Sequence, residues 1–187
     1  MSDSKLLNKE VMNFFYKKEE GKSLSNFWEC IIKIKDKNKT REYDNGECCF
    51  HGEKFIVISK LCKDEKRKKD LLEYGRKFLS GFCVSDGNLV KKLGRKFVLN
   101  KEELDLWNRL SIDVQIQICK YKFENYEKVR NDLNKSKILI HPAMRCSDEK
   151  VKSRFWEGRL IIVDGNTQVI GMNMLGKIWM KLRDEKC

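Results

Sequence analysis

The feature of this sequence with the clearest chemical content is a run of polar side chains at helical spacing. Glu47, His51 and Lys54 stand at offsets of four and seven from one another along the chain. In an α-helix of about 3.6 residues per turn, residues at these offsets share one face. An acid, an imidazole and an amine on one face, with Phe50 and Phe55 beside them, predict a site that handles a polarised covalent bond.

Two structural interpretations compete with this chemistry. Asp44 stands three residues before Glu47, which is the spacing of a capping box, so Glu47 could serve only to start the helix. Lys54 could be held in an ion pair with a neighbouring carboxylate, because buried lysines are usually paired. From these residues alone, both alternatives stay open.

The length and composition predict a folded globular protein. The chain has 187 residues, with 41% hydrophobic and 10% aromatic residues, so it fits one domain with an ordinary core. We expect a single domain over residues 1–187, with residues 1–10 flexible. No apolar run is long enough for a membrane span, and the first ten residues lack the apolar core of a signal peptide. We therefore expect a cytoplasmic protein without a membrane partner, with the nucleus as the alternative location.

The eight cysteines do not follow the spacing of a metal site or a disulfide framework. There is no C-x-x-C pair, and the local cluster is Cys48, Cys49 and His51. Adjacent cysteines in a helix point about 100° apart, which does not suit one metal ion. We expect reduced thiols in a reducing compartment, no metal and no cofactor.

The net charge of +12, mostly from lysine, favours a phosphate-bearing partner. A basic field attracts phosphates of nucleic acid, a dinucleotide or a phosphosugar. Lysine lacks the planar fork that reads guanine edges, so sequence-specific DNA reading is not implied. A compositional bias of the genome could also produce the lysines, and this alternative stays open.

Hydrophobic periodicity predicts a helix-rich α+β domain with a small antiparallel or mixed sheet. The interior of the expected helix over 101–122 is Leu104, Trp107, Leu110, Val114, Ile118 and Tyr121, at spacings of three or four residues. Turns are expected at 35–40 and 43–46, with Asp44 as the helix N-cap. The other expected strands are 11–16, 29–35, 137–141 and 159–164, and the other expected helices are 64–80, 125–135 and 171–185.

Several blocks of the chain, in order, resemble one known family. They are Phe15-Tyr16, Leu24-Ser25-Asn26-Phe27, Glu47-x-x-Phe50-x-x-x-Lys54-Phe55, Trp107, Lys122-Phe123, Trp156-Glu157-Gly158, Gly171-x-Asn173-Met174-Leu175-Gly176-Lys177 and Arg183. Together they resemble the NADAR superfamily, the YbiA-like N-glycosidases associated with NAD and ADP-ribose. The resemblance covers nearly the whole chain and implies a YbiA-like fold.

The resemblance implies metal-independent cleavage of an N-glycosidic bond at a phosphorylated ribose. Family members act on ADP-ribose attached to guanine in nucleic acid, or on a riboflavin-pathway intermediate. The residues that match the family's motifs make Glu47 and Lys54 the expected catalytic pair. Glu47 would stabilise the oxocarbenium-like transition state. Lys54 would hold a phosphate or hydroxyl, or, if neutral, attack C1 to form an imine.

The matched blocks also imply a set of substrate-binding residues. Their members are Ser25, Asn26, Phe27, Trp107, Trp156, Gly171, Asn173 and Lys177. His51 is also an expected substrate-binding residue, although it departs from the family pattern, which usually has glutamine four residues after the glutamate. Trp156, beside a glycine in a loop, is the better ligand wall, whereas Trp107 also fits the core stripe of its helix. Asn173 and the amides that open the last helix would form an anion seat, although helix capping alone would also explain Asn173.

The chain departs from the family pattern at its second carboxylate. Ser153 stands where an acid is usual, three before Trp156. Asp148 is the expected replacement and third catalytic residue, while Glu157 and Asp164 stay open. His141 could act as a general acid, although a histidine at a strand end is more often structural.

Three functions remain open from the sequence. The first is an N-glycosyl hydrolase that removes ADP-ribose from modified guanine in nucleic acid, or acts on a related NAD-derived substrate. The second is an N-glycosidase of phosphoribosyl metabolites of the riboflavin pathway. The third is a binding module for ADP-ribose or nucleic acid without turnover. The expected partners are accordingly an ADP-ribose-type or phosphoribosyl substrate and, through the basic surface, nucleic acid.

Overall fold

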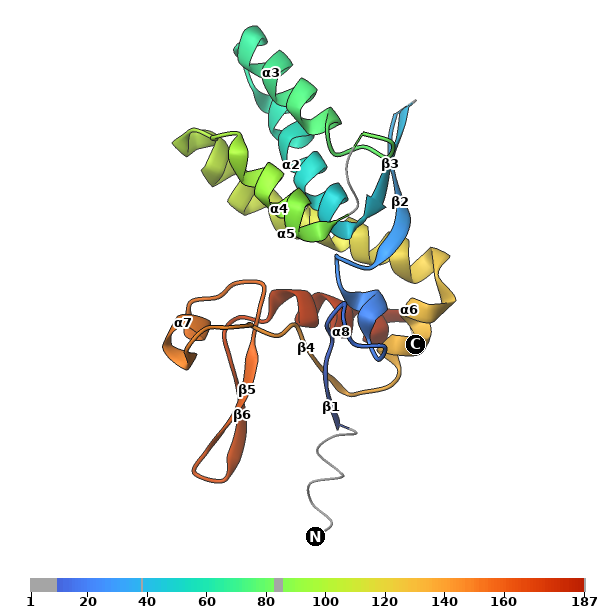
Figure 1. Cartoon of the computed structure of the whole chain (residues 1–187), viewed down its shortest axis with the longest axis vertical. Coiled ribbons are helices and arrows are strands. Elements are labelled where there is room, and N and C mark those ends of the chain that lie inside the picture. Colours follow the sequence, from blue (N-terminus) through green and yellow to red (C-terminus); the bar gives the residue numbers. More distant parts are fainter. Residues whose placement is uncertain (1–9, 38, 83–85, 187) are drawn as a thin grey trace. The chain divides into compact units, whose positions relative to one another are not determined.

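The chain folds into two compact units that each combine helices with strands. The computed structural model describes residues 10–37, 39–82 and 86–186. The central unit is Asn26–Lys122, and the terminal unit is Met1–Ser25 together with Phe123–Cys187. The predicted helix-rich α+β class is confirmed (Figure 1). That residues 1–187 form one domain stays a prediction, and the prediction for residues 1–10 falls, apart from Glu10, outside the described residues.

The central unit begins with an antiparallel hairpin and continues with helices. Strands β2 (Glu29–Asp36) and β3 (Lys39–Asn45) pair with a register shift between Glu29 and Ile32. The strand β2 alternates buried and exposed positions, as its sequence predicts. The expectation of turns at 35–40 and 43–46 is largely wrong, because β2 ends at Asp36 and β3 occupies residues 39–45. Its polar sequence, KTREYDN, lacks the alternation of apolar and polar residues that predicts a strand.

Helix α2 (Gly46–Leu61) carries the predicted polar face and begins one residue later than a cap at Asp44 requires. The N-cap is Asn45, whose side-chain oxygen accepts from the Cys48 N–H at 2.8 Å. Asp44 instead accepts from the Ser80 hydroxyl at 2.5 Å. The capping box between Asp44 and Glu47 is therefore wrong, and Glu47 does not start this helix.

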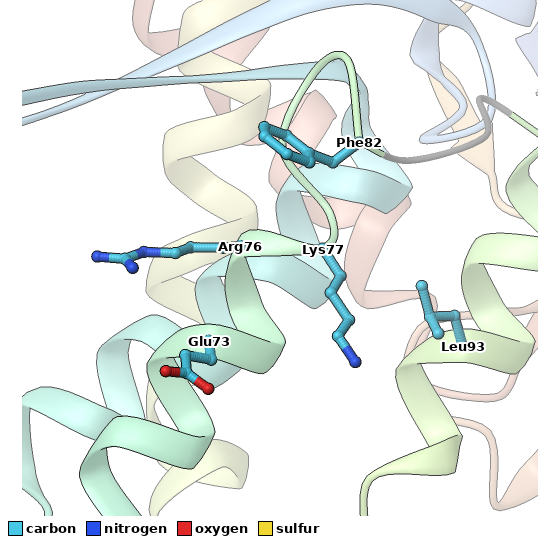
Figure 2. Close-up of a pocket in the computed structure, with 5 residues that line it drawn as sticks. All are labelled: Glu73, Arg76, Lys77, Phe82 and Leu93. Carbon is cyan, nitrogen blue, oxygen red and sulfur yellow. The ribbon is translucent and has the colours of Figure 1, made fainter.

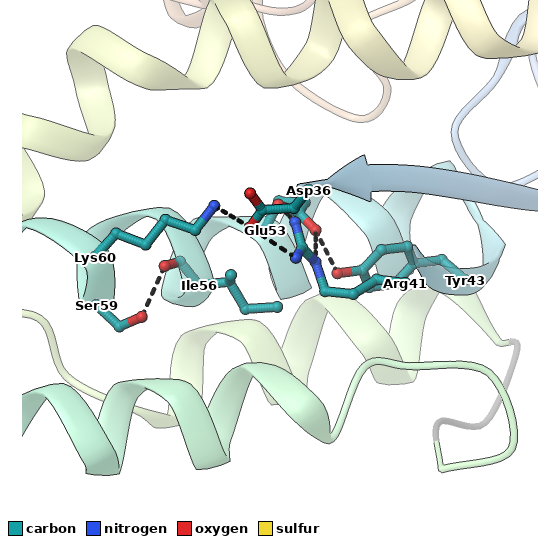
Figure 3. A network of polar contacts seen from close by, with 7 residues as sticks. All are labelled: Asp36, Arg41, Tyr43, Glu53, Ile56, Ser59 and Lys60. Atoms are coloured by element: carbon teal, nitrogen blue, oxygen red, sulfur yellow. Dashed lines mark hydrogen bonds and ion pairs between the residues drawn. The ribbon is translucent and has the colours of Figure 1, made fainter. Parts of the chain in front are cut away.

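The middle of α2 is fixed to the hairpin by a buried ion pair. Arg41 donates from Nε and Nη2 to the two Glu53 carboxylate oxygens, at 2.7 and 3.0 Å. The Tyr43 hydroxyl donates to the same carboxylate at 2.6 Å (Figure 3). Arg41 also reaches Asp36, which pairs with Lys60, about two turns after Glu53 along α2. Burial and the Glu53 charge raise the pKa of Tyr43, so its hydroxyl remains a donor.

Three more helices complete the central unit. Helix α3 (Glu65–Arg76), capped by Asp64, and helix α4 (Gly87–Lys96), capped by Asp86, both pack on α2. Helix α4 is absent from the expected elements because its sequence is short, polar and contains two glycines. Helix α5 (Lys101–Asn125) forms as predicted.

The predicted interior face of α5 is only partly right. Trp107, Val114 and Ile118 are buried, but Leu104 is 47% exposed. Glu103 is buried in its place because Arg67 holds both of its carboxylate oxygens, at 2.8 and 2.7 Å. An ion pair thus shifts the buried stripe by one residue at the start of α5.

Besides a parallel strand pair and a hairpin, the described part of the terminal unit contains a 3₁₀ helix and three α-helices. Strand β1 (Val11–Asn13) pairs in parallel with β4 (Ile138–Ile140), and α8 (Met174–Lys186) packs beside β4. The 3₁₀ helix η1 (Lys22–Leu24) contacts α6 (Glu127–Leu133). The short helix α7 (Asp148–Lys152) precedes the hairpin of β5 (Arg159–Val163) and β6 (Asn166–Ile170).

The strands of the described residues form three two-stranded sheets rather than the one small sheet that we expected. Only β1 and β4 join segments far apart in sequence, whereas the two hairpins pair neighbours. No helix among the described residues is long and apolar enough to cross a membrane. The six cysteines in this part of the chain are free thiols.

Candidate functional site

The predicted polar face of α2 is present and largely buried. Glu47 and His51 are each 9% exposed, and Lys54 is 8% exposed. The His51 Nε2 atom lies 3.2 Å from Glu47 Oε1. An ionised carboxylate can only accept, so Nε2 carries the hydrogen of this contact. Glu47 is thereby oriented by one neighbour and keeps its second carboxylate oxygen for other partners.

The other ring nitrogen of His51 faces helix α4. His51 Nδ1 is the buried side-chain polar atom that lacks a hydrogen-bond partner within the described ranges. A Cβ atom added at Gly94 would overlap this nitrogen, so α4 packs directly on the imidazole. An N–H at Nδ1 would have no acceptor there, whereas a hydrogen on Nε2 is directed at Glu47.

The substitution Gly94→Ala tests this close packing. Alanine would normally stabilise a helix by about 1 kcal/mol over glycine. Here we expect a net loss of about 1–3 kcal/mol in the free energy of unfolding, because the methyl group displaces His51 or α4. Chemical denaturation measures it, with the exposed Asn88→Ala on the same helix as control. An unchanged or raised stability in Gly94→Ala would contradict the packing.

Lys54 is the most perturbed base on this face. Its ammonium donates to the Gly94 carbonyl at 2.6 Å and lies 4.4 Å from the centroid of the Phe55 ring. Burial, followed by the nearby charge of Arg95, lowers the pKa of Lys54 to about 8, against the opposing charge of Glu47. Near pH 8 this amine can therefore exist in both protonation states, which an ordinary surface lysine cannot do.

The loop before β2 is fastened to the start of α2. The Asn26 carbonyl accepts from the Glu47 N–H at 3.0 Å. Its side-chain amide exchanges two hydrogen bonds with Gln115 of α5, at 2.8 and 3.0 Å. A Cβ atom at Gly46 would approach Asn26 Oδ1 to 2.7 Å, so only glycine permits this approach. Asn26 therefore positions Glu47, and its amide already has a partner.

Aromatic side chains enclose this face. Phe50 meets the Trp107 ring edge-on at a centroid distance of 4.9 Å, and Trp107 is 8% exposed. This agrees with the packing role that its helical stripe predicts. Phe27 packs on the first turn of α4, where a Cβ at Gly87 would meet the ring at 2.5 Å. Both predicted aromatic residues of the central unit therefore support the helices around Glu47.

The remaining predicted substrate residues belong to the terminal unit. Ser25 is buried and follows η1, while Lys177 is exposed on α8. Asn173 is buried at the start of α8 with a positive φ of 46°. Its side chain accepts from the His141 N–H at 3.0 Å and donates to the Leu139 carbonyl at 2.9 Å. Asn173 thus fixes the end of β4, and its amide is not directed at the α8 backbone.

The expected anion seat at α8 is wrong, because its donors are used inside the fold. The N–H groups of Met172, Asn173, Met174 and Leu175 donate to the carbonyls of Arg154, Glu157, Phe155 and Trp156, respectively. The two glycines of this motif also serve internal packing. At Gly171, with φ of 78°, a Cβ would lie 2.7 Å from the Glu157 carbonyl. At Gly176 it would overlap the Leu139 carbonyl.

The loop of Trp156 is an internal brace of the terminal unit. The Trp156 carbonyl accepts from the Leu175 N–H and lies 3.3 Å from His141 Nδ1. Its indole packs edge-on against Phe155, and the His141 ring stacks on Phe14. These contacts support the structural interpretation of His141.

The three candidates for the second carboxylate are all on the surface of the terminal unit. Asp148 is 56% exposed at its side chain and pairs with Arg159 at 2.5 Å. Glu157 lies 3.9 Å from Arg154, and Asp164 forms the β5–β6 turn with φ of 50°. Among the described residues, Glu47 of the central unit is the only predicted catalytic carboxylate that has a buried imidazole as its partner.

Three contributors to the central site were missed from the sequence. They are Gln115, which holds Asn26, and Gly94 and Arg95 of α4, which contact or influence Lys54. Gln115 lies beside Val114 on the buried face of α5, and a polar residue in that stripe was the available signal. Nothing in the local pattern of α4 indicated that its backbone carbonyl would accept from Lys54.

Cavities of the central unit lie outside this polar face. One of about 400 Å³ lies between α3 and α4 and is lined by Glu73, Arg76, Lys77, Phe82 and Leu93 (Figure 2). Another of about 370 Å³ lies near the Arg67–Glu103 pair. Within the described part of the chain, no three His, Cys, Asp or Glu side chains are grouped to hold a metal ion.

No family model matches the chain, and no curated protein matches it.

Proposed function

We infer that this protein is a metal-independent N-glycosidase that cleaves the bond between a base and the C1 carbon of a phosphorylated ribose. The substrate that we favour is ADP-ribose joined to guanine in nucleic acid, or a related NAD-derived compound. The observation that carries this proposal is the buried face of α2, where Glu47 contacts His51 and Lys54 has a lowered pKa. The resemblance to NADAR proteins at Glu47 and Lys54 supports it.

The proposed chemistry follows from the charge that develops on the sugar. As the C1–N bond lengthens, positive charge spreads over C1 and the ring oxygen, and a nearby carboxylate stabilises it. Glu47 supplies that carboxylate and can orient or deprotonate the attacking water. His51 holds Glu47 in one orientation through the 3.2 Å contact. Asn26 fixes the helix start beneath it.

Lys54 has two candidate roles, and its protonation state distinguishes them. With a pKa of about 8, most of the amine is protonated at neutral pH, so we favour the role of a cation that binds phosphate or ribose oxygen. Arg95 adds a second positive charge close by, as a phosphate subsite requires. A neutral amine would instead attack C1 of the opened sugar and form an imine as the bond from C1 to the base breaks and the base leaves with a proton. Water would then hydrolyse the imine, which releases the sugar and restores the amine.

The pH dependence of activity tests the role of Lys54. We expect kcat/KM to fall as pH rises through about 8, because the protonated amine is lost there. Lys54→Arg should move this decline upward, since an arginine stays charged throughout the range. Activity that rises through pH 8, together with a borohydride-trapped adduct that disappears in Lys54→Ala, would establish the imine role instead.

A substrate panel tests the proposed function itself. The protein is incubated with an oligonucleotide that carries ADP-ribose on guanine and, in parallel, with phosphoribosyl intermediates of riboflavin synthesis. We expect release of ADP-ribose and restoration of unmodified guanine. Turnover of the riboflavin intermediates alone would assign the metabolic alternative. Binding of ADP-ribose without release from any substrate would assign the binding-module alternative.

A further inference from the structure

Helix α4 presents an uncompensated row of positive charge. Residues 87–96 contain Lys91, Lys92, Arg95 and Lys96 but no acidic residue. The last three are exposed and stand at offsets of three and four, so they share one helix face. The opposite face, with Gly87, Val90 and Gly94, is buried.

These cations differ from the lysines of the neighbouring helix. On α3, Lys68 and Lys69 pair with Glu65 and Glu73 along the helix. None of the three exposed cations of α4 takes part in an ion pair between described residues. Their positive charge is therefore available to bind a ligand.

The end of α3 adds positive charge near α4, and the segment after α3 adds an aromatic ring. Arg76 and Lys77 close α3 and line the 400 Å³ cavity with Leu93 of α4 and Phe82 (Figure 2). Phe82 is 79% exposed, which is unusual for a ring of this size. The lone acid of the cavity lining, Glu73, lies 3.9 Å from Lys69.

We propose that α4, the end of α3 and Phe82 form a docking surface for single-stranded nucleic acid. Cations one helical turn apart are separated by about 6 Å, a spacing that suits successive phosphates of an extended strand. Lysine-rich surfaces bind phosphate without reading base edges. Exposed aromatic rings stack on unpaired bases, whose faces are hidden in a duplex. This combination favours a single strand over a duplex or an acidic protein.

The surface adjoins the candidate site through α4 itself. The Gly94 carbonyl accepts from Lys54, and Arg95 of the docking face is close enough to influence the Lys54 amine electrostatically. A strand held along the exposed cations would lie on the opposite side of α4 from the face that packs on α2. The inference deepens the nucleic-acid branch of the proposed function, but binding by this surface requires no glycosidic cleavage.

The proposal is tested by measuring the affinity of the protein for a labelled oligothymidine that carries no modification. Its length is about 12 nucleotides, which is within the usual site sizes. Fluorescence anisotropy gives the affinity at each concentration of a salt series. For Lys92→Gln/Lys96→Gln we expect about tenfold weaker binding and a salt slope shallower by about 1.4, because each phosphate contact on a single strand contributes about 0.7. The control Lys35→Gln/Lys120→Gln removes the same charge from exposed positions on β2 and α5 and should change affinity less than twofold.

Phe82→Ala supplies a second, independent readout. We expect it to weaken single-strand binding about fivefold or more and to leave binding of the matching duplex unchanged. Equal losses in the two double variants, equal affinity for duplex or polyglutamate, or no effect of Phe82→Ala would each overturn the proposal. Because the oligonucleotide carries no ADP-ribose, failure here leaves cleavage of ADP-ribosylated guanosine, assayed separately, as the test of the proposed function.

Discussion

Glu47→Gln should abolish most of the activity while leaving the fold intact. We expect kcat to fall by about 10³-fold, because the amide neither stabilises positive charge at C1 nor accepts a proton from water. The fold should persist, since the helix cap is Asn45 and the bond to Asn26 uses the Glu47 backbone. Steady-state release of ADP-ribose from ADP-ribosylated guanosine measures the effect, with thermal denaturation alongside.

The exposed Glu102→Gln is the matched control, as it removes a carboxylate that lines a cavity with the last turn of α2, at the opposite end of that helix from Glu47. It should retain activity within about twofold of the unmodified protein, as expected for an exposed residue without a role. Substrate should still bind to Glu47→Gln, because the proposed phosphate contacts belong to Lys54 and Arg95. A Glu47→Gln variant within tenfold of full activity would remove Glu47 from the mechanism.

Glu53→Ala should cause the largest loss of stability among single substitutions in the central unit. It leaves Arg41, 15% exposed at its side chain, without its bidentate partner and removes the acceptor of Tyr43. Breaking one side of a buried pair costs about 3–5 kcal/mol in the free energy of unfolding. Urea denaturation monitored by circular dichroism measures this loss.

Two further variants separate the buried charge from the loss of packing. Glu42→Ala removes a surface pair with Lys33 and should change stability by less than about 1 kcal/mol. Arg41→Met/Glu53→Leu replaces both charges with apolar groups and should recover much of the loss, because no unpaired charge remains. If Glu53→Ala proved as mild as Glu42→Ala, the buried pair would not be what fixes α2 on the hairpin.

The elements that the sequence predicted well are those with strong hydrophobic periodicity. Strand β2 alternates cleanly, and α5 and α8 carry apolar residues every three or four positions. Strands β3 and β6 lack a regular apolar pattern. In β3, Arg41 forms an ion pair with Glu53, and β6 is almost entirely exposed. Such strands have no periodic signal, and their pairing partners alone define them.

The candidate site was predictable where its residues share one helix. Glu47, His51 and Lys54 needed only the 3.6-residue period to be placed together. The contacts that tune them come from elsewhere, as the Gly94 carbonyl and Gln115 do, and local spacing carries no information about them. The anion seat failed for the same reason, because the amides of α8 are taken by a loop that a sequence pattern cannot place.

Hydrolysis in water enriched in ¹⁸O tests the central claim most directly. An oligonucleotide with ADP-ribose on guanine is incubated with the protein, and both products are analysed by mass spectrometry. The proposed cleavage of C1–N places one ¹⁸O atom on the ribose of released ADP-ribose and leaves guanine intact and unlabelled. Label on a phosphate, which signals phosphoester cleavage, or no release at all would contradict the assignment of this protein as an N-glycosidase.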